Sequence, residues 1–283
     1  MGSTHNGNGS AIKDMEQGSF HGDNASHEEK LRNALTNTMT LSPELFEKIY
    51  LSPKGDTKGD LRKTFANPTP IAITGFVVGL LPLSCEYMGW RGSGGTFATA
   101  TTSASVFFGG VLLTFGGIGE FFLGNSFPCL VFFAYGAHFF TYAAAFIPWF
   151  GAVAWNSSPA GNDYSPGPTF AAGFGFYPLA LGMLSFIFLI CSLRTNLVFV
   201  LIFVCATMGF GFAAGSLWAT ALGSAAYGNT LLIATGACFF AADMLGWYLL
   251  LAIMIAVMEL PVPDLPVFDL SNVIKAKSRT KQD

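Results

Sequence analysis

Charged side chains are nearly absent between residues 68 and 260, and this feature constrains the fold more than any other. The stretch carries seven of them: Glu86, Arg91, Glu120, Asp163, Arg194, Asp243 and Glu259. A soluble domain is typically about 25% charged, whereas this chain is 11% charged and has a mean hydropathy of +0.50. So little charge excludes a soluble globular enzyme, and the stretch has no basic face for nucleic acid. The pattern indicates an all-α polytopic membrane protein.

The same stretch divides into six apolar runs, each close to the roughly 20 residues that a bilayer-spanning helix requires. Segments rich in Gly, Pro, Asn or Ser separate the runs, as expected for turns between helices. We therefore predict six transmembrane helices, at about 70–89, 102–123, 128–150, 174–193, 197–219 and 230–258. Residues 67–260 would form one pore domain.

The ends of the chain have a different composition. Residues 1–66 are polar and predict a disordered tail, and residues 261–283 form a short polar tail. Eight of the Lys and Arg residues lie at or before Lys63 and four at or after Lys275. Because six spans place both tails on one side, the positive-inside rule makes both termini cytoplasmic. The sequon at Asn156 would then lie in an external loop, where it could be glycosylated.

The sequence gives no sign of a metal, cofactor or catalytic site. The five cysteines fall within apolar runs and lack metal-site spacing, so we expect them to be small core residues. No phosphate-binding glycine motif is present. The missing glycine motif argues against a pump driven by ATP, and nothing in the sequence indicates an enzyme.

The most specific local pattern is Asn67-Pro68-Thr69-Pro70, directly before the first span. Asn is a favoured helix N-cap, and Pro at the first helical position gives up an amide hydrogen that would be unpaired anyway. The motif thus predicts a helix start. The alternative interpretation is an anion site, because free amides and a positive dipole end would meet any anion passing at that depth.

The signature formed by residues 67–76 resembles the NPAPLGL-x-GF motif of the acetate uptake transporter family. That family includes the bacterial succinate–acetate permease and fungal acetate/ammonia-export proteins. Further motifs match in the same order. They are Phe108-Gly109-Gly110, Gly119-Glu120-Phe121, Leu123-Gly124-Asn125-Ser126-Phe127, Tyr135-Gly136, Phe146-Ile147-Pro148-Trp149-Phe150, Ser192-Leu193-Arg194 and Leu260-Pro261-Val262-Pro263-Asp264-Leu265.

The resemblance implies six-helix protomers in a ring, a homohexamer, with a narrow pore through each protomer. Acetate and other short monocarboxylates would pass along it. The implied constriction consists of Phe76, Tyr135 and Ala206, the last found by counting from Arg194 and replacing the family's leucine. The implied substrate path comprises Asn67, Pro68, Thr69, Pro70, Thr74, Phe76 and Tyr135, whose hydroxyl and amide groups could offset part of the cost of removing an anion from water.

Three charged residues invite separate hypotheses. Glu120 and Arg194 are predicted to lie at the same membrane face, where they could form an ion pair. Asp243 lies near the middle of the sixth run and matches no acidic position of the family. An ionisable residue at that depth is a functional candidate, so Asp243 is either a proton site that couples uptake to a proton gradient or a buried, hydrogen-bonded neutral carboxyl.

The sequence thus predicts a multi-pass protein of a fungal plasma membrane that moves acetate or similar acids, with or without proton coupling. Its expected partners are the lipid bilayer, a small carboxylate and further copies of itself, with no nucleic acid. Two alternatives stay open. One is an exporter of ammonia or ammonium, and the other is a non-transporting sensor whose N-terminal tail carries signals.

Overall fold

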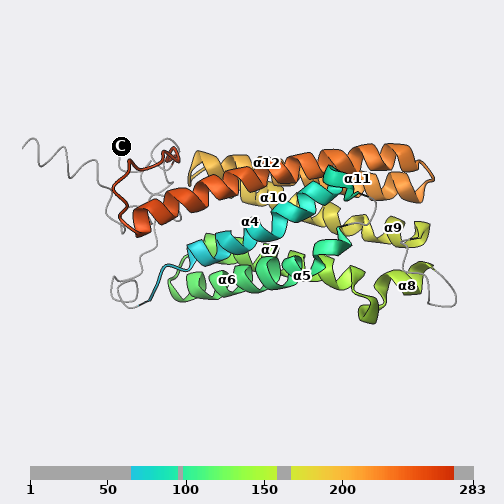
Figure 1. Ribbon diagram of the computed structural model, residues 1–283, viewed down its shortest axis with the longest axis horizontal. Coiled ribbons are helices and arrows are strands. Elements are labelled where there is room, and N and C mark those ends of the chain that lie inside the picture. Colours follow the sequence, from blue (N-terminus) through green and yellow to red (C-terminus); the bar gives the residue numbers. More distant parts are fainter. Residues whose placement is uncertain (1–64, 95–97, 158–166, 271–283) are drawn as a thin grey trace, which may run out of the picture. The chain divides into compact units, whose positions relative to one another are not determined.

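The computed structural model describes residues 65–94, 98–157 and 167–270. Among these residues, six helical segments are long and apolar enough to cross a membrane, which confirms the predicted fold class (Figure 1). The segments are α4 (Thr69–Tyr87), a composite second span (Thr99–Phe122), α7 (Ser126–Phe146), α9 with α10 (Pro168–Ser192), α11 (Leu197–Ala221) and α12 (Ala225–Val257). The predicted tails at 1–64 and 271–283 lie outside the described residues.

The helices differ from the predicted runs at three places. The sixth run was expected from residue 230, but α12 begins at Ala225 and includes Gly228 and Asn229, which were expected in a turn. Proline and glycine explain the other two. The third run was expected to continue to residue 150, but α7 ends at Phe146. Pro148 disfavours a helical conformation for Ile147, which is extended at φ −76° and ψ 123°, and the chain continues as the short helix η4 (Pro148–Phe150). The fourth span begins earlier than predicted. It consists of α9 (Pro168–Phe174) and α10 (Phe176–Ser192), which meet at Gly175.

The second span changes its helical form along its length. It comprises η2 (Thr99–Thr101), α5 (Thr102–Ala104), the π-helical η3 (Ser105–Leu112) and α6 (Leu113–Phe122). Its glycines allow very close packing, as is common for helices in lipid. A Cβ at Gly116 would overlap the Cβ of Ala72 and lie 3.0 Å from its Cα. The second span therefore lies directly against α4.

Helix α4 packs against both groups of helices that flank it. It contacts α12 as well as η3 and α6, while α11 packs against α10 and α12 (Figure 1). Gly246 shows the closeness on the α12 side, since a Cβ there would lie 2.7 Å from Val77 and 2.8 Å from the Phe76 ring. Residues of α4 are consequently placed among α12, α6 and α7.

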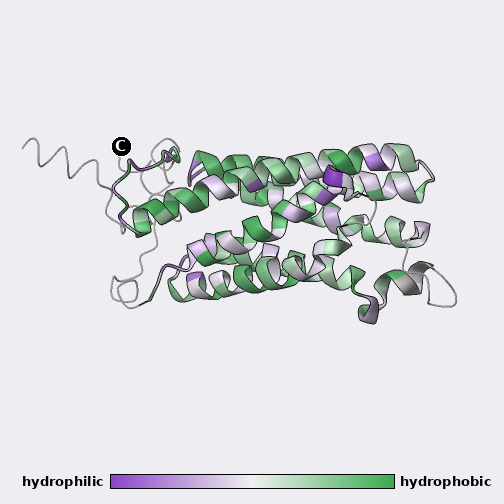
Figure 2. Cartoon of the chain, in the orientation of Figure 1, coloured by the Kyte–Doolittle hydropathy of each residue, from purple (hydrophilic) through white to green (hydrophobic). Residues whose placement is uncertain are grey.

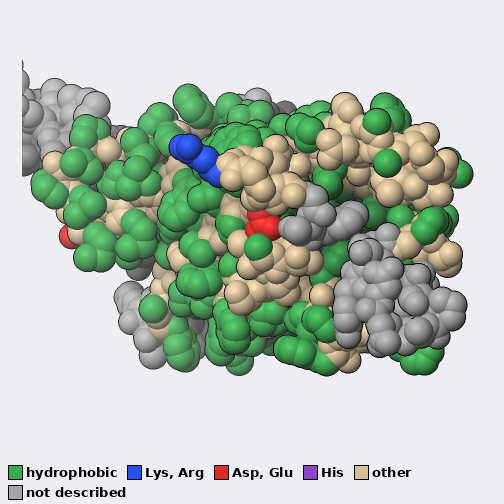
Figure 3. Space-filling view, turned by 45° about the vertical axis from the view of Figure 1, so that its right-hand side comes forward, with side chains coloured by type: hydrophobic (Ala, Val, Ile, Leu, Met, Phe, Trp, Pro, Cys, Tyr) green, Lys and Arg blue, Asp and Glu red, His purple; other side chains and the backbone are tan. Residues whose placement is uncertain are grey.

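The helices consist largely of apolar residues (Figure 2), and many of these residues are exposed. Large side chains such as Phe107, Phe115, Phe121 and Met183 are more than 60% exposed. The face drawn in Figure 3 is likewise dominated by hydrophobic side chains, with few charged ones. Such a surface suits lipid or contacts with further membrane-embedded helices.

The C-terminal segment is attached to the helices as far as residue 270. The Leu197 amide donates to the Phe268 carbonyl at 3.0 Å, and the Leu270 amide donates to the Thr195 carbonyl at 2.9 Å. The Tyr248 hydroxyl donates to the Pro266 carbonyl at 2.7 Å, and Val267 is buried. Residues 261–270, expected from sequence to begin the tail, thus pack on the turn between α10 and α11.

Candidate functional site

A buried group of polar side chains fastens the start of α4. The Thr69 amide donates to Asn67 Oδ1 at 2.9 Å, and the Thr69 hydroxyl donates to Glu120 Oε1. Asn125 Nδ2 donates to Glu120 Oε2 at 2.6 Å. Thr69, Glu120 and Asn125, which we call the Glu120 network, are all buried. Buried polar groups require hydrogen-bond partners, and each Glu120 oxygen has one.

This network changes the reading of the signature. Asn67 satisfies the first free amide of α4, so the predicted helix start is present, one residue after Pro68. The hydroxyl of Thr74 donates to the Pro70 carbonyl of its own helix at 2.7 Å. These contacts are internal to the protein. The roles of Asn67, Pro68, Thr69, Pro70 and Thr74 on a substrate path stay predictions.

The predicted ion pair also stays a prediction. Glu120 receives hydrogen bonds from Thr69 and Asn125. Arg194 lies in the turn between α10 and α11, where its amide donates to the Cys191 carbonyl at 3.4 Å.

Two of the predicted constriction residues, Phe76 and Tyr135, line the same cavity. This proximal cavity lies toward the end of the bundle where α4, α7 and α11 begin, and encloses about 380 Å³ of empty space. Its exposed walls are apolar. They consist of Ile73, Phe76, Leu113, Val131, Phe132, Tyr135, Phe199, Ile202, Phe203, Gly246 and Leu249.

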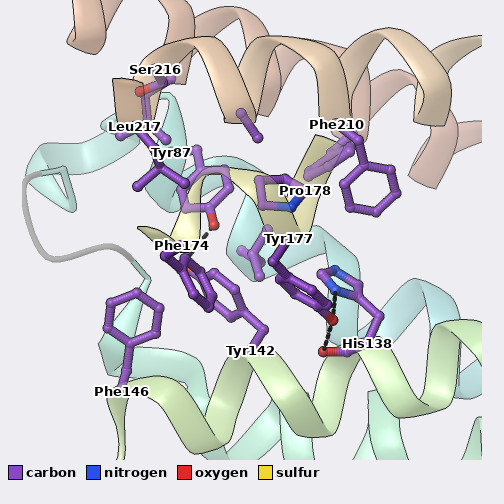
Figure 4. Close-up of a pocket in the computed structure, with 14 residues that line it drawn as sticks. Tyr87, His138, Tyr142, Phe146, Phe174, Tyr177, Pro178, Phe210, Ser216 and Leu217 are labelled. Carbon is purple, nitrogen blue, oxygen red and sulfur yellow. Dashed lines mark hydrogen bonds between the residues drawn. The ribbon is translucent and has the colours of Figure 1, made fainter. Parts of the chain in front are cut away.

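A second, distal cavity lies toward the other end of the same helices and encloses about 560 Å³ (Figure 4). Its lining is mostly aromatic, with a few polar groups. The lining residues are Leu83, Tyr87, His138, Tyr142, Phe146, Phe174, Tyr177, Pro178, Phe210, Ala213, Ser216, Leu217, Leu232 and Phe239. Helices α4, α7, α9, α10, α11 and α12 all contribute to it.

A stack of aromatic rings stands between the two cavities. The Tyr135 ring stacks on Phe203 at 6.3 Å and on Phe210 at 6.4 Å between centroids. Tyr135 and Phe203 line the proximal cavity, and Phe210 lines the distal one. Phe210 also contacts Phe239 at 5.1 Å. The rings of Tyr135 and Phe210 therefore form the wall between the cavities.

Ala206, the third constriction residue implied by the resemblance, lies at the level of this wall. Phe203 and Phe210 are seven residues apart, about 10 Å along α11. The Tyr135 ring, centred 6.3 Å from the Phe203 ring and 6.4 Å from the Phe210 ring, lies between these two levels of α11, the height of Ala206. Ala206 is 8% exposed. Its role in the constriction stays a prediction. Counting along the sequence did not single out Phe203 or Phe210, which lie about one helical turn on either side of Ala206.

The polar groups at the distal cavity are paired hydroxyls and an imidazole. Tyr87 donates to the Tyr142 hydroxyl at 2.6 Å, and the Tyr177 hydroxyl pairs with His138 Nδ1 at 3.0 Å. Figure 4 shows both pairs at the distal cavity. Farther in, the hydroxyl of Tyr135 pairs with that of Ser185 at 2.9 Å.

Asp243 is fully buried in the middle of α12. Gly236 and Gly246, which share its helix face, pack against Tyr87 and Val77 of α4. Neither carboxyl oxygen of Asp243 has a hydrogen-bond partner within the part of the chain that the structure describes. The side chain of Trp247, four residues farther along the same helix, lies close enough to interact with the Asp243 carboxyl. The proton site and the hydrogen-bonded neutral carboxyl therefore both stay predictions.

Comparison with known proteins assigns this arrangement to a family. The profile of the GPR1/FUN34/yaaH family matches residues 51–270. The chain belongs to this family. The match confirms the resemblance seen in the signature and in the ordered motifs that follow it.

Relatives within the family are mostly fungal. Protein alcS of Aspergillus fumigatus is 44% identical over 258 residues, covering 89% of this chain and 94% of alcS. Acetate transporter protein patA of Aspergillus clavatus is 28% identical, covering 66% of this chain and 72% of patA. Ammonia transport outward protein 2 of Saccharomyces cerevisiae is 28% identical, and the match covers 52% of this chain and 49% of that protein.

A solved structure shares the fold of the helical domain. The bacterial acetate channel SatP superposes with a TM-score of 0.55 at 22% identity, covering 72% of this chain and 99% of that chain. The likeness agrees with the six-helix architecture described above.

Proposed function

We propose that this protein moves acetate and other short monocarboxylic acids across a membrane through a path within its own helices. The observation that carries the proposal is the alignment of two cavities on either side of the Tyr135–Phe210 wall. The names of patA and SatP, which refer to acetate, support this choice of substrate.

The geometry suits a gated path for small molecules. A pore needs donors and acceptors that bind a solute weakly and an apolar constriction that excludes water. The Tyr87–Tyr142 and Tyr177–His138 pairs of the distal cavity supply the donors and acceptors, and the Tyr135–Phe210 wall supplies the apolar constriction. A molecule can pass only when the ring of Tyr135 or Phe210 rotates aside. A short acid needs a narrower opening than a long acid does. The wall therefore sets an upper limit on the size of the substrate.

The test is uptake of radiolabelled acetate by the purified protein in liposomes. Wild-type protein should give uptake above that of empty liposomes. Phe210→Ala removes the ring and should admit longer acids such as butyrate. Phe212→Ala is the matched control, because Phe212 is 37% exposed on the same helix. Absence of acetate uptake by the wild-type protein would refute the proposal.

We further propose that both termini face the cytoplasm and that the protomers form a ring in a fungal plasma membrane. The basic residues of the two tails support the orientation, and the apolar surface is compatible with a ring. Asn156 lies in α8 (Ala152–Ser157), in the connection after α7. A gel shift that is removed by a glycosidase and by Asn156→Gln would place this connection outside the cytoplasm. Cross-linking in native membranes would report the number of protomers.

One observation favours a second candidate, the movement of ammonia or ammonium. The six spans contain Glu86, Glu120 and Asp243 but no Lys or Arg, so their formal charge suits a cation better than an anion. A relative is named for outward ammonia transport. In liposomes, an ammonium flux that acetate does not inhibit would favour this candidate over the first.

A further inference from the structure

The charges within the membrane pose a problem for an anionic substrate. The three ionisable carboxyls of the six spans can add only negative charge, and no Lys or Arg is present to offset it. A carboxylate that entered the bundle would lose its water and gain no cationic partner. Burying an unpaired charge is far more costly than burying a neutral polar group that can form hydrogen bonds.

The distal cavity offers what a neutral acid requires. Its polar lining consists of the Tyr87–Tyr142 hydroxyl pair, the Tyr177–His138 pair and the Ser216 hydroxyl. A phenol hydroxyl donates one hydrogen bond and can also accept one or more. An undissociated carboxyl group has the same two functions, with one O–H donor and one carbonyl acceptor.

We propose that the distal cavity is a binding site for the uncharged form of short carboxylic acids. This proposal rests on the proposed function and specifies the chemical form of its substrate. The acid hydroxyl donates to one tyrosine oxygen of the Tyr87–Tyr142 pair, and the acid carbonyl accepts from the other tyrosine. The methyl group then faces the aromatic lining, which includes Phe146 and Phe174.

The arrangement has a consequence for proton coupling. An acid that crosses the wall in its neutral form carries its own proton from one side to the other. Such transport acidifies the receiving compartment without moving net charge. The titratable groups at the cavity are the three tyrosines and His138, with Glu86 beside Tyr87. Of these groups, only a protonated His138 could supply a positive charge to an anion, so the test must include that residue.

The experiment uses the full-length protein in liposomes at mildly acidic pH, with empty liposomes subtracted. Two small probes separate the forms of the substrate. Acetamide is neutral and planar like acetic acid, whereas trifluoroacetate stays ionised. We expect acetamide to inhibit the uptake of labelled acetate and trifluoroacetate to leave that uptake unchanged. On a solid-supported membrane, acetate transport should produce no electrical current.

Variants locate the site. Tyr87→Phe and Tyr142→Phe keep the rings and should each raise the half-saturating acetate concentration about fivefold to tenfold, the effect of one hydrogen bond. Tyr227→Phe is the matched control, because Tyr227 is 61% exposed. His138→Gln should keep electroneutral uptake.

Three results would overturn the proposal while leaving acetate transport intact. These are inhibition by trifluoroacetate but not acetamide, an acetate-driven current that His138→Gln abolishes, and normal acetate affinity in both tyrosine variants. Absence of any acetate uptake by the wild-type protein would instead overturn the proposed function.

Discussion

Replacing Ala206 with leucine separates two views of the constriction. The resemblance places an open lining position at Ala206, which a leucine would fill. In the structure the Tyr135 ring lies at the same level, stacked on Phe203 and Phe210. Because Ala206 is buried, the three carbons added by Ala206→Leu must displace that ring or move α11.

The expected cost follows from this packing. Adding methylene groups to a well-packed interior destabilises a protein by about 1–3 kcal/mol. For a domain of this size, each kcal/mol lowers the melting temperature by about 2–4 °C. We therefore expect Ala206→Leu to melt about 2–12 °C below the wild type. Acetate uptake should fall too, because the wall is distorted.

Thermal unfolding in detergent and uptake in liposomes together test this expectation. Ala237→Leu is the matched control, since it makes the same change at an exposed position of α12 and should leave melting nearly unchanged. If Ala206→Leu melts at or above the wild-type temperature and still transports acetate while excluding larger acids, Ala206 lines open space and our account of the wall is wrong.

Three further predictions concern packing and charge. Gly116→Ala should destabilise the protein by about 1–3 kcal/mol, because its Cβ would overlap Ala72. Thermal unfolding in detergent measures this loss. Gly211→Ala is the control and should leave the melting temperature unchanged, because Gly211 has open space around it. If Glu120 and Arg194 form an ion pair, reversing either charge alone should lower the yield of folded protein, and reversing both together should restore it. A yield of the double variant as low as that of the single variants would argue against the pair. Asp243→Asn should keep uptake that declines as pH rises, because the acid brings its own proton; a flat pH profile would assign the proton step to Asp243.

The helices were predictable because each is recorded in local sequence. Length and hydropathy alone placed six spans, since a bilayer demands long apolar segments whatever their neighbours are. The boundaries that shifted involve proline and glycine. Pro148 ended α7 early, and the fourth span includes the short helix before Gly175. Both effects are local, but hydropathy does not register them.

The candidate site was predictable only in part, because it depends on contacts between distant residues. Phe76 and Tyr135, which the resemblance had singled out, line one cavity, and their role as a constriction stays a prediction. The position of Phe210 in the wall emerged only from its stacking on Tyr135. Attachment of the C-terminal segment is also non-local, through the bridge between Asn196 and Asp269. No periodic pattern marks either contact.

The Glu120 network gives the signature a mechanical role that differs from substrate binding. Thr69 begins α4, and Phe76 follows it by seven residues, two helical turns or about 10 Å higher. Fixing Thr69 therefore fixes the height and rotation at which Phe76 meets the proximal cavity. A change at Asn125 would shift the lining without altering a lining residue. Variants of Asn125 and Phe76 could then show the same altered selectivity. Only the Asn125 variant would also remove a hydrogen bond from the buried Glu120 carboxyl. That loss would destabilise the protein by about 1.5–3 kcal/mol and lower its melting temperature.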